Sequence, residues 1–205
     1  IVKSVANGRN IYKNIKSSIK FLLSGNASGI LSVLYASIMA LPMPFHAVHL
    51  LFINLLTDSL PAIAIGMEKS QKDLLKDKPR GRNSSILSKD LIAEIALEGL
   101  VISVFTLAAF YMGLKVNDAV GSTMAFATLC LARLFHGFNC RGDKSIFSIG
   151  LFSNRYSWMA FGVGLLLLNA VLFLPFMQSL FEVSVLTGSQ IGYIYLFAFL
   201  PTVII

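Results

Sequence analysis

Long apolar blocks, separated by shorter polar segments, run through the whole sequence. Each block has roughly the 20 residues that an α-helix needs to cross the hydrocarbon core of a bilayer. The pattern therefore predicts six transmembrane helices, at residues 18–41, 45–66, 91–114, 120–140, 158–177 and 191–205. The last helix stops inside its apolar run, and the chain starts at Ile1 without a signal-peptide pattern, so we expect both ends to be cuts in a longer protein.

Residues 1–17 are polar and basic, and they continue into the first span without a helix-breaking residue. We expect a cytoplasmic helical stalk there, although a basic segment in contact with anionic lipid would have the same composition. The alternation at period two that is typical of transmembrane β-strands does not occur. The predicted fold is therefore all-α, a polytopic membrane helix bundle with residues 18–205 as one six-helix domain. Pro42 and Pro44 are expected to close its first two helices into an antiparallel hairpin.

The composition indicates a membrane protein rather than a water-soluble domain. Of the 205 residues, 56% are hydrophobic and 13% are charged, whereas soluble domains carry about 25% charged residues. The net charge of +7 comes from lysine and arginine before the first span, between the second and third spans, and between the fourth and fifth spans. The alternate connections contain only Lys115, and this bias places the N-terminus and the loops 67–90 and 141–157 in the cytoplasm. The expected partner is thus the lipid bilayer, and not a nucleic acid.

A polar cluster interrupts the second span. Asn54, Thr57 and Asp58 are spaced i, i+3 and i+4, so they share one face of a helix. An aspartate near the middle of a bilayer costs about 2.5–3.5 kcal/mol on insertion scales, and its presence there is a hypothesis of function. Pro61 follows three residues later, and it removes a backbone hydrogen bond, which leaves carbonyl groups free to turn toward an ion.

The first span adds a further polar side chain, Asn26, between two glycines at i and i+4, Gly25 and Gly29, which allow close approach of a neighbouring helix. A carboxylate, two amide oxygens and a hydroxyl are ligands for Ca²⁺, Mg²⁺, Mn²⁺ or an alkali ion, and not the set that zinc or copper favours. The structural alternative is that the asparagines and the threonine form hydrogen bonds between helices. Such bonds would not explain an unpaired carboxylate.

The fourth span carries Arg133 and His136. Arg133 lies deep enough to pair with Asp58, but its long side chain could also reach the cytoplasmic interface by snorkelling. Both interpretations stay open at this point. We interpret His136 as a hydrogen-bond donor between helices rather than a metal ligand.

Four other reactive or charged residues have simpler expected roles. Cys130 and Cys140 would lie about 15 Å apart along one helix, too far for a disulfide, and we interpret them as packing residues. Glu94 and Glu98 share one face at the start of the third span, where we expect them to be solvated or paired with loop lysines.

Three segments, in this order, resemble one protein family. GRNIYKNIK at residues 8–16 resembles the stalk before a fifth transmembrane helix, and NLLTDSLPAIAIG at 54–66 resembles the sixth helix, whose N-x-x-T-D-x-x-P core binds a cation. DLLKDKPRGRNSSIL at 73–87 resembles the cytoplasmic loop that follows. Over essentially its whole length, the chain resembles helices five to ten, the C-terminal transmembrane region, of type II P-type cation-transporting ATPases, the family of the calcium pumps.

The resemblance implies that four residues bind the transported cation, which would be Ca²⁺: Asn26, Asn54, Thr57 and Asp58. Two positions depart from the two-site calcium pumps, because Gly29 and Arg133 stand where those pumps have glutamates. Both departures fall on the same calcium site, and Arg133 would act there as a counter-charge. We therefore expect one ion per cycle, with the site closed by a glutamate on an upstream helix outside this chain.

The resemblance also implies that most of the pump lies outside this chain, including four further helices and the actuator, phosphorylation and nucleotide-binding domains. ATP and Mg²⁺ would act only through those domains, so the chain should be inactive as an ATPase by itself. Phosphorylation in those domains would move the stalk, and the movement of the stalk would reorient the cation ligands on the first two spans. The expected location is the plasma membrane, with a cytoplasmic N-terminus.

Other functions remain as alternatives. The same oxygen cluster would serve a pump for Mn²⁺, Na⁺/K⁺ or H⁺. A membrane module that anchors or regulates a partner, without transport, is a second alternative. An independent channel or carrier is disfavoured because the sequence contains no internal repeat.

Overall fold

The structure is a computed structural model that describes residues 2–69, 85–142 and 150–205. Every regular element in these ranges is a helix, which confirms the predicted all-α class. The elements are α1 (Val2–Ile38), α2 (Ala47–Phe52), the π-helix η1 (Ile53–Asp58), α3 (Ser59–Gly66), α4 (Lys89–Leu114), α5 (Asp118–Asn139), α7 (Arg155–Phe173), α8 (Pro175–Leu180) and α9 (Gly188–Ile204).

Five of the described segments are long and apolar enough to cross a membrane: α1, the continuous segment Ala47–Gly66, α4, α5 and α7. The sixth, α9, is apolar but has only 17 residues. The predicted count of six spans thus becomes five full-length helices and one shorter helix. The chain is an integral, multi-pass membrane protein.

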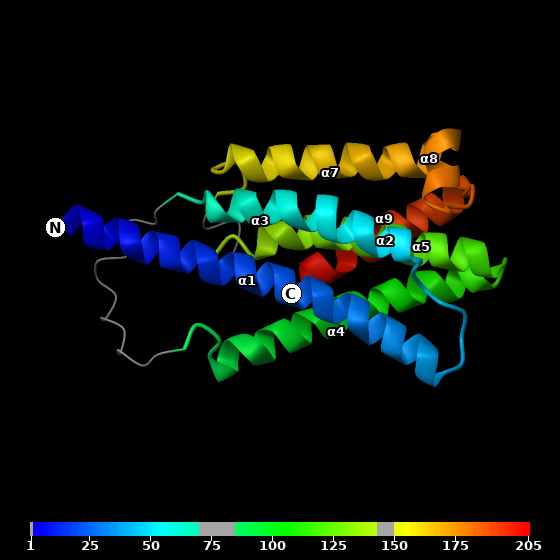
Figure 1. Ribbon diagram of the computed structural model, residues 1–205, viewed down its shortest axis with the longest axis horizontal. Helices are drawn as coiled ribbons and strands as arrows, with labels where there is room; N and C mark the ends of the chain where they lie inside the picture. The colour runs from blue at the N-terminus through cyan, green and yellow to red at the C-terminus, as the bar shows by residue number, and fades with distance from the viewer. Residues whose placement is uncertain (1, 70–84, 143–149) are drawn as a thin grey trace.

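The long helices lie side by side along the longest axis of the molecule, and α1 crosses α4 (Figure 1). Helix α5 is the centre of the bundle, because it packs against α4, α7, α9 and η1 and is buried over most of its length. The turn between α4 and α5 brings their backbones into contact. A Cβ atom on Gly113 would lie 2.5 Å from the Cα of Gly121, so only glycine fits at this crossing.

The first helix is longer than a membrane span, with 37 residues from Val2 to Ile38. The segment predicted to be a stalk and the first predicted span therefore form one continuous helix. The N-terminal end of α1 projects beyond the neighbouring helices (Figure 1). Because α1 is one continuous helix, a movement of its N-terminal end would be transmitted along the helix into the bundle.

Two predicted helices have different boundaries or a different internal structure from those expected. The helix predicted at 158–177 begins at Arg155, where the side chain of Asn154 caps it, and ends at Phe173 because Pro175 starts the separate helix α8. The segment predicted at 45–66 begins at Ala47 and contains η1. Most of the predicted basic loop, including residues 73–84 of the segment quoted for the family resemblance, lies outside the described residues.

Candidate cation-binding site

The three polar residues of the second span all belong to the π-helix η1. Short π-helical turns are rare, and they occur frequently at functional sites. The hydroxyl of Thr57 donates to the carbonyl of Ile53 at 2.9 Å, and the hydroxyl of Ser59 donates to the carbonyl of Asn54 at 3.3 Å. Pro61 cannot donate a backbone hydrogen bond back to this turn. Pro61 therefore follows a locally widened turn of the helix. The helix does not break at the proline, because it continues as α3, which contains Pro61.

Asp58 and Arg133 form an ion pair inside the bundle. The Nη2 atom of Arg133, on α5, donates to Oδ2 of Asp58 at 2.5 Å. The two residues are 3% and 2% exposed, respectively. This geometry decides between the two interpretations of Arg133, because its guanidinium points to Asp58 and does not snorkel to an interface. A buried pair of this kind leaves a costly isolated charge when either partner is removed.

The same guanidinium connects η1 with the first helix. Its Nη2 atom also donates to Oδ1 of Asn26 at 3.2 Å. It can reach this position because residue 25 of α1 is a glycine: a Cβ atom there would lie 2.5 Å from both Nε and Nη2 of Arg133. Two of the predicted ligands, Asn26 and Asp58, thus meet at Arg133.

One oxygen of this carboxylate has no hydrogen-bond partner among the described residues. The Oδ1 atom of Asp58 is buried, and the described residues offer it no hydrogen-bond donor. A buried polar atom without a partner costs about 1–3 kcal/mol, so such an atom calls for a ligand. A cation would supply one. The predicted ligand set, a carboxylate with amide and hydroxyl oxygens, is of the kind that suits a hard cation.

The other predicted ligands are distributed over two environments. Thr57 is fully buried beside Asp58, whereas Asn26 and Asn54 are exposed. Ser28 is buried, and its hydroxyl donates to the carbonyl of Gly25 at 2.6 Å. The structure therefore gathers Asn26, Asp58 and Arg133 by direct contact, and it leaves the amide of Asn54 on an open side of η1.

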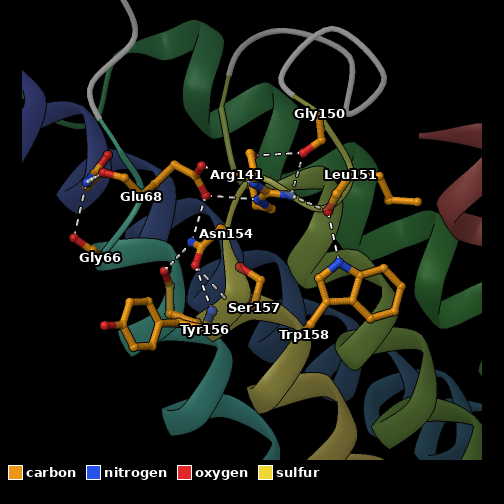
Figure 2. A network of polar contacts seen from close by, with 12 residues as sticks. Gly66, Glu68, Arg141, Gly150, Leu151, Asn154, Tyr156, Ser157 and Trp158 are labelled. Atoms are coloured by element: carbon orange, nitrogen blue, oxygen red, sulfur yellow. Dashed lines mark hydrogen bonds and ion pairs between the residues drawn. The ribbon is translucent and has the colours of Figure 1, made fainter.

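A second buried ion pair, which the sequence analysis missed, lies at the end of α3. Glu68 and Arg141 face each other there (Figure 2), with Nε and Nη2 of Arg141 donating to the two carboxylate oxygens at 2.9 and 3.0 Å. Asn154 donates to Glu68 at 2.8 Å and to the carbonyl of Ala64 at 2.9 Å. Arg141 also donates to the carbonyls of Gly150 and Leu151. The network ties the end of α3 to the start of α7.

The same network includes the first helix. The side chain of Asn14 donates to the carbonyls of Glu68 and Gly66 at 2.8 and 3.1 Å. Helix α1 is thus fixed to the C-terminal end of the segment that carries η1. The sequence offered only a weak signal, since Arg141 looked like one more cytoplasmic charge of the positive-inside pattern.

The glutamates of α4 also differ from expectation. Glu94 and Glu98 pair with Lys20 of α1, at 3.0 and 2.8 Å, whereas the loop lysines at positions 72, 76 and 78 lie outside the described residues. Glu98 is buried and lies 3.5 Å from Nε2 of His136. The interhelical role expected for His136 is present, because the same nitrogen lies 2.9 Å from the hydroxyl of Ser24.

Comparison with known proteins agrees with this architecture. The sequence profile of the family described as "Cation transporting ATPase, C-terminus" matches residues 42–205. A calcium-transporting ATPase of Bacillus subtilis is 38% identical over 91% of the chain, and calcium-transporting ATPase 1 of Bacillus cereus is 36% identical over 100% of it. Human calcium-transporting ATPase type 2C member 1 is 33% identical over 91%.

These relatives are much longer proteins. The chain covers 25% of the Bacillus cereus protein and 21% of the Bacillus subtilis and human proteins. The matched family region, the all-helical membrane architecture and the extent of the similarity together assign the chain. It belongs to the P-type cation-transporting ATPases and corresponds to their C-terminal transmembrane region.

Proposed function

We propose that this chain is the membrane-embedded transport domain of an ATP-driven Ca²⁺ pump. The observation that carries the proposal is the buried carboxylate of Asp58, which uses one oxygen for Arg133 and keeps the other free of protein donors in the described structure. It lies on a π-helical turn in a membrane-crossing segment. The names of the relatives, all calcium-transporting ATPases, support Ca²⁺ as the cargo.

The proposed ligands of the transported ion are Asn26, Asn54, Thr57 and Asp58. All four supply oxygen atoms, the donors that Ca²⁺ prefers. Because Ca²⁺ takes 6–8 oxygen ligands, parts of the pump outside this chain, or water, must supply the others. The exposed positions of Asn26 and Asn54 support an upstream helix packing over this side of the site.

Arg133 is the proposed counter-charge, and it limits the pump to one Ca²⁺ per cycle. A guanidinium stays protonated in proteins, so it brings a permanent positive charge next to Asp58. Gly29 adds no carboxylate that could balance a second divalent ion. The proposed stoichiometry rests on these two residues together.

Transport would be driven from outside this chain. We place the action of ATP and Mg²⁺, the phosphorylation and actuator domains and the four remaining helices in parts of the pump outside this chain. The N-terminal part of α1 would be cytoplasmic and would carry movement into the bundle of a plasma-membrane protein. The contacts of Asn14 with the end of α3 support this route, since they fix the stalk to the segment that holds Asp58.

The test uses the complete pump, meaning the protein that carries this chain together with those cytoplasmic domains. Asp58→Asn keeps the shape of the side chain and removes its charge, so Ca²⁺-dependent phosphorylation by ATP should be lost. Asp118→Asn is the matched control, because Asp118 is exposed at the start of α5 and should leave phosphorylation unchanged. Normal Ca²⁺ transport by Asp58→Asn would refute the site.

A further inference from the structure

A second group of candidate ligands lies one helical turn from Arg133, where α1, α4 and α5 meet. Glu98 comes from α4, and His136 and Cys140 come from the end of α5. Their ligand atoms all lie within 4.8 Å of one another, and all three residues are buried. Within residues 2–69, 85–142 and 150–205, these are the histidine, cysteine and acidic side chains that come together in this way.

Of the two distances from Nε2 of His136, the one to Glu98 falls within the range expected for the coordination shell of a small divalent ion, and the one to Cys140 is slightly shorter. The Nε2 atom of His136 is 3.2 Å from Sγ of Cys140 and 3.5 Å from Oε2 of Glu98. Zinc bonds of about 2.0–2.3 Å in a tetrahedron put neighbouring ligand atoms roughly 3.3–3.8 Å apart. His136 and Cys140 are spaced i, i+4 and therefore share one helix face. The hydroxyl of Ser24, 2.9 Å from the same Nε2 atom, lies in reach as a further polar neighbour.

A second observation about Glu98 also points to a ligand for this group. The Oε2 atom of Glu98 is buried and forms no regular hydrogen bond among the described residues, and Nε2 of His136 lies 3.5 Å from it. Glu98 is only 6% exposed, so bulk solvent has little access to this oxygen. An ion between Oε2 and Nε2 would satisfy this oxygen.

The charges around the group permit a divalent ion. Lys20 lies 3.0 Å from Glu94 and 2.8 Å from Glu98, so one of these glutamates balances the lysine. The carboxylate of Glu98 and a thiolate at Cys140 would then balance a charge of two, because metal binding releases the thiol proton. Side-chain exposures of 55% for Glu94 and 23% for Lys20 mark the side from which an ion could enter.

We propose that Glu98, His136 and Cys140 form a binding site for a borderline-soft divalent cation such as Zn²⁺, separate from the oxygen cluster at Asp58. Imidazole and thiolate select such ions, whereas the oxygen ligands proposed for transport select Ca²⁺. The bound ion would join α4 to α5 next to α1. This site does not depend on the proposed transport function, and it gives Cys140 a role beyond packing.

The probe is Co²⁺, added to the intact, detergent-solubilised protein that contains this chain. A cobalt–thiolate bond gives a charge-transfer absorption band, and Zn²⁺ should compete it away. Cys140→Ser should abolish the band. Cys130→Ser, which changes the other buried cysteine of the same helix, should leave it unchanged.

Two further variants separate this site from folding defects and from the transport site. Glu98→Gln nearly preserves the side-chain shape and should weaken Co²⁺ binding at least tenfold, with an unchanged elution volume in size-exclusion chromatography. Asp58→Asn should retain the full band, even if transport is lost. A folded wild-type protein without the band, or a Cys140→Ser protein that keeps it, would overturn the proposal.

Discussion

The guanidinium of Arg133 lies against the backbone of Gly25, so closely that a Cβ atom on this glycine would be 2.5 Å from its Nε and Nη2 atoms. One turn further along α1, a Cβ atom on Gly29 would meet only Leu129, at an ordinary 3.8 Å. The two glycines look equivalent in the sequence, but only the first makes room for the buried ion pair. Replacing each glycine by alanine should therefore have different effects on the stability of the protein.

Gly25→Ala should displace Arg133 from Asp58 and destabilise the protein by about 1–3 kcal/mol, the usual cost of overpacking a well-packed interior. Gly29→Ala should be neutral or should stabilise α1 by about 0.5–1 kcal/mol, because alanine favours a helix more than glycine does. The measurement is the thermal unfolding of the detergent-solubilised protein. Equal shifts in the two variants would show that Gly25 has no special relationship with Arg133.

Asn54→Ala should weaken Ca²⁺ binding to the complete pump at least tenfold, or about 1.4 kcal/mol for one lost oxygen ligand. Because Asn54 is exposed in this chain, its substitution should not disturb the packing of the bundle. Ser28→Ala is the control, since this hydroxyl is already engaged by the carbonyl of Gly25. If both variants bind Ca²⁺ equally well, Asn54 is not a ligand.

Glu68→Gln should destabilise the protein by about 3–5 kcal/mol, because it leaves the guanidinium of Arg141 buried without its charge partner. Glu94→Gln removes a more exposed acid, 55% exposed, and should cost no more than about 1 kcal/mol. Chemical denaturation of the two variants gives the comparison. If the two variants lose similar amounts of unfolding free energy, the bidentate Glu68–Arg141 pair stabilises the protein no more than a surface contact does.

The transmembrane helices could be anticipated from the sequence, whereas the Asp58–Arg133 pair was one of two interpretations that the sequence left open. Apolar length predicts a membrane helix, and a charge inside such a helix needs a partner, but the long side chain of Arg133 was equally compatible with snorkelling. The spacing of Asn54, Thr57 and Asp58 placed them on one turn. It did not reveal that this turn is π-helical, since Pro61 alone is compatible with a kink, a break or a widened turn.

The Glu68–Arg141 pair and the Lys20–Glu98 pair could not be anticipated in this way. Their partners are separated by 73 and 78 positions, and they meet only after the rotation and depth of several helices are fixed. The rotation and depth of a helix depend on packing contacts such as Gly113 against Gly121. The pattern of neighbouring residues in the sequence does not reveal such contacts. Charges at the ends of spans fit the positive-inside pattern whether or not they form a pair.

The orientation of the chain in the membrane can be tested with single cysteines. Leu87→Cys lies in the predicted cytoplasmic loop before α4, and Val185→Cys lies in the predicted outer connection between α8 and α9; both positions are exposed. In intact cells, an impermeant maleimide should label Val185→Cys, and it should label Leu87→Cys only after permeabilisation. Equal labelling of the two from outside would contradict the positive-inside assignment.

The stoichiometry of the pump should depend on Arg133 and Gly29 together. The unmodified complete pump should bind one Ca²⁺ per molecule, with a Hill coefficient of about 1, because a single site cannot show cooperativity. Combining Arg133→Glu with Gly29→Glu replaces the fixed positive charge by two carboxylates and should create a second Ca²⁺ site. Equilibrium binding of ⁴⁵Ca²⁺ to the purified pump measures the number of bound ions and the Hill coefficient.

The single substitutions are the decisive controls, because each changes the charge without completing a site. Arg133→Glu alone would put a second carboxylate beside Asp58 with no cation between them, and Gly29→Glu alone would add a carboxylate at a buried position of α1 without a charge partner. Each single variant should therefore be less stable and should bind Ca²⁺ more weakly than the double variant. Two Ca²⁺ ions bound cooperatively by the unmodified pump would refute the counter-charge role, since Arg133 would then leave room and charge for both.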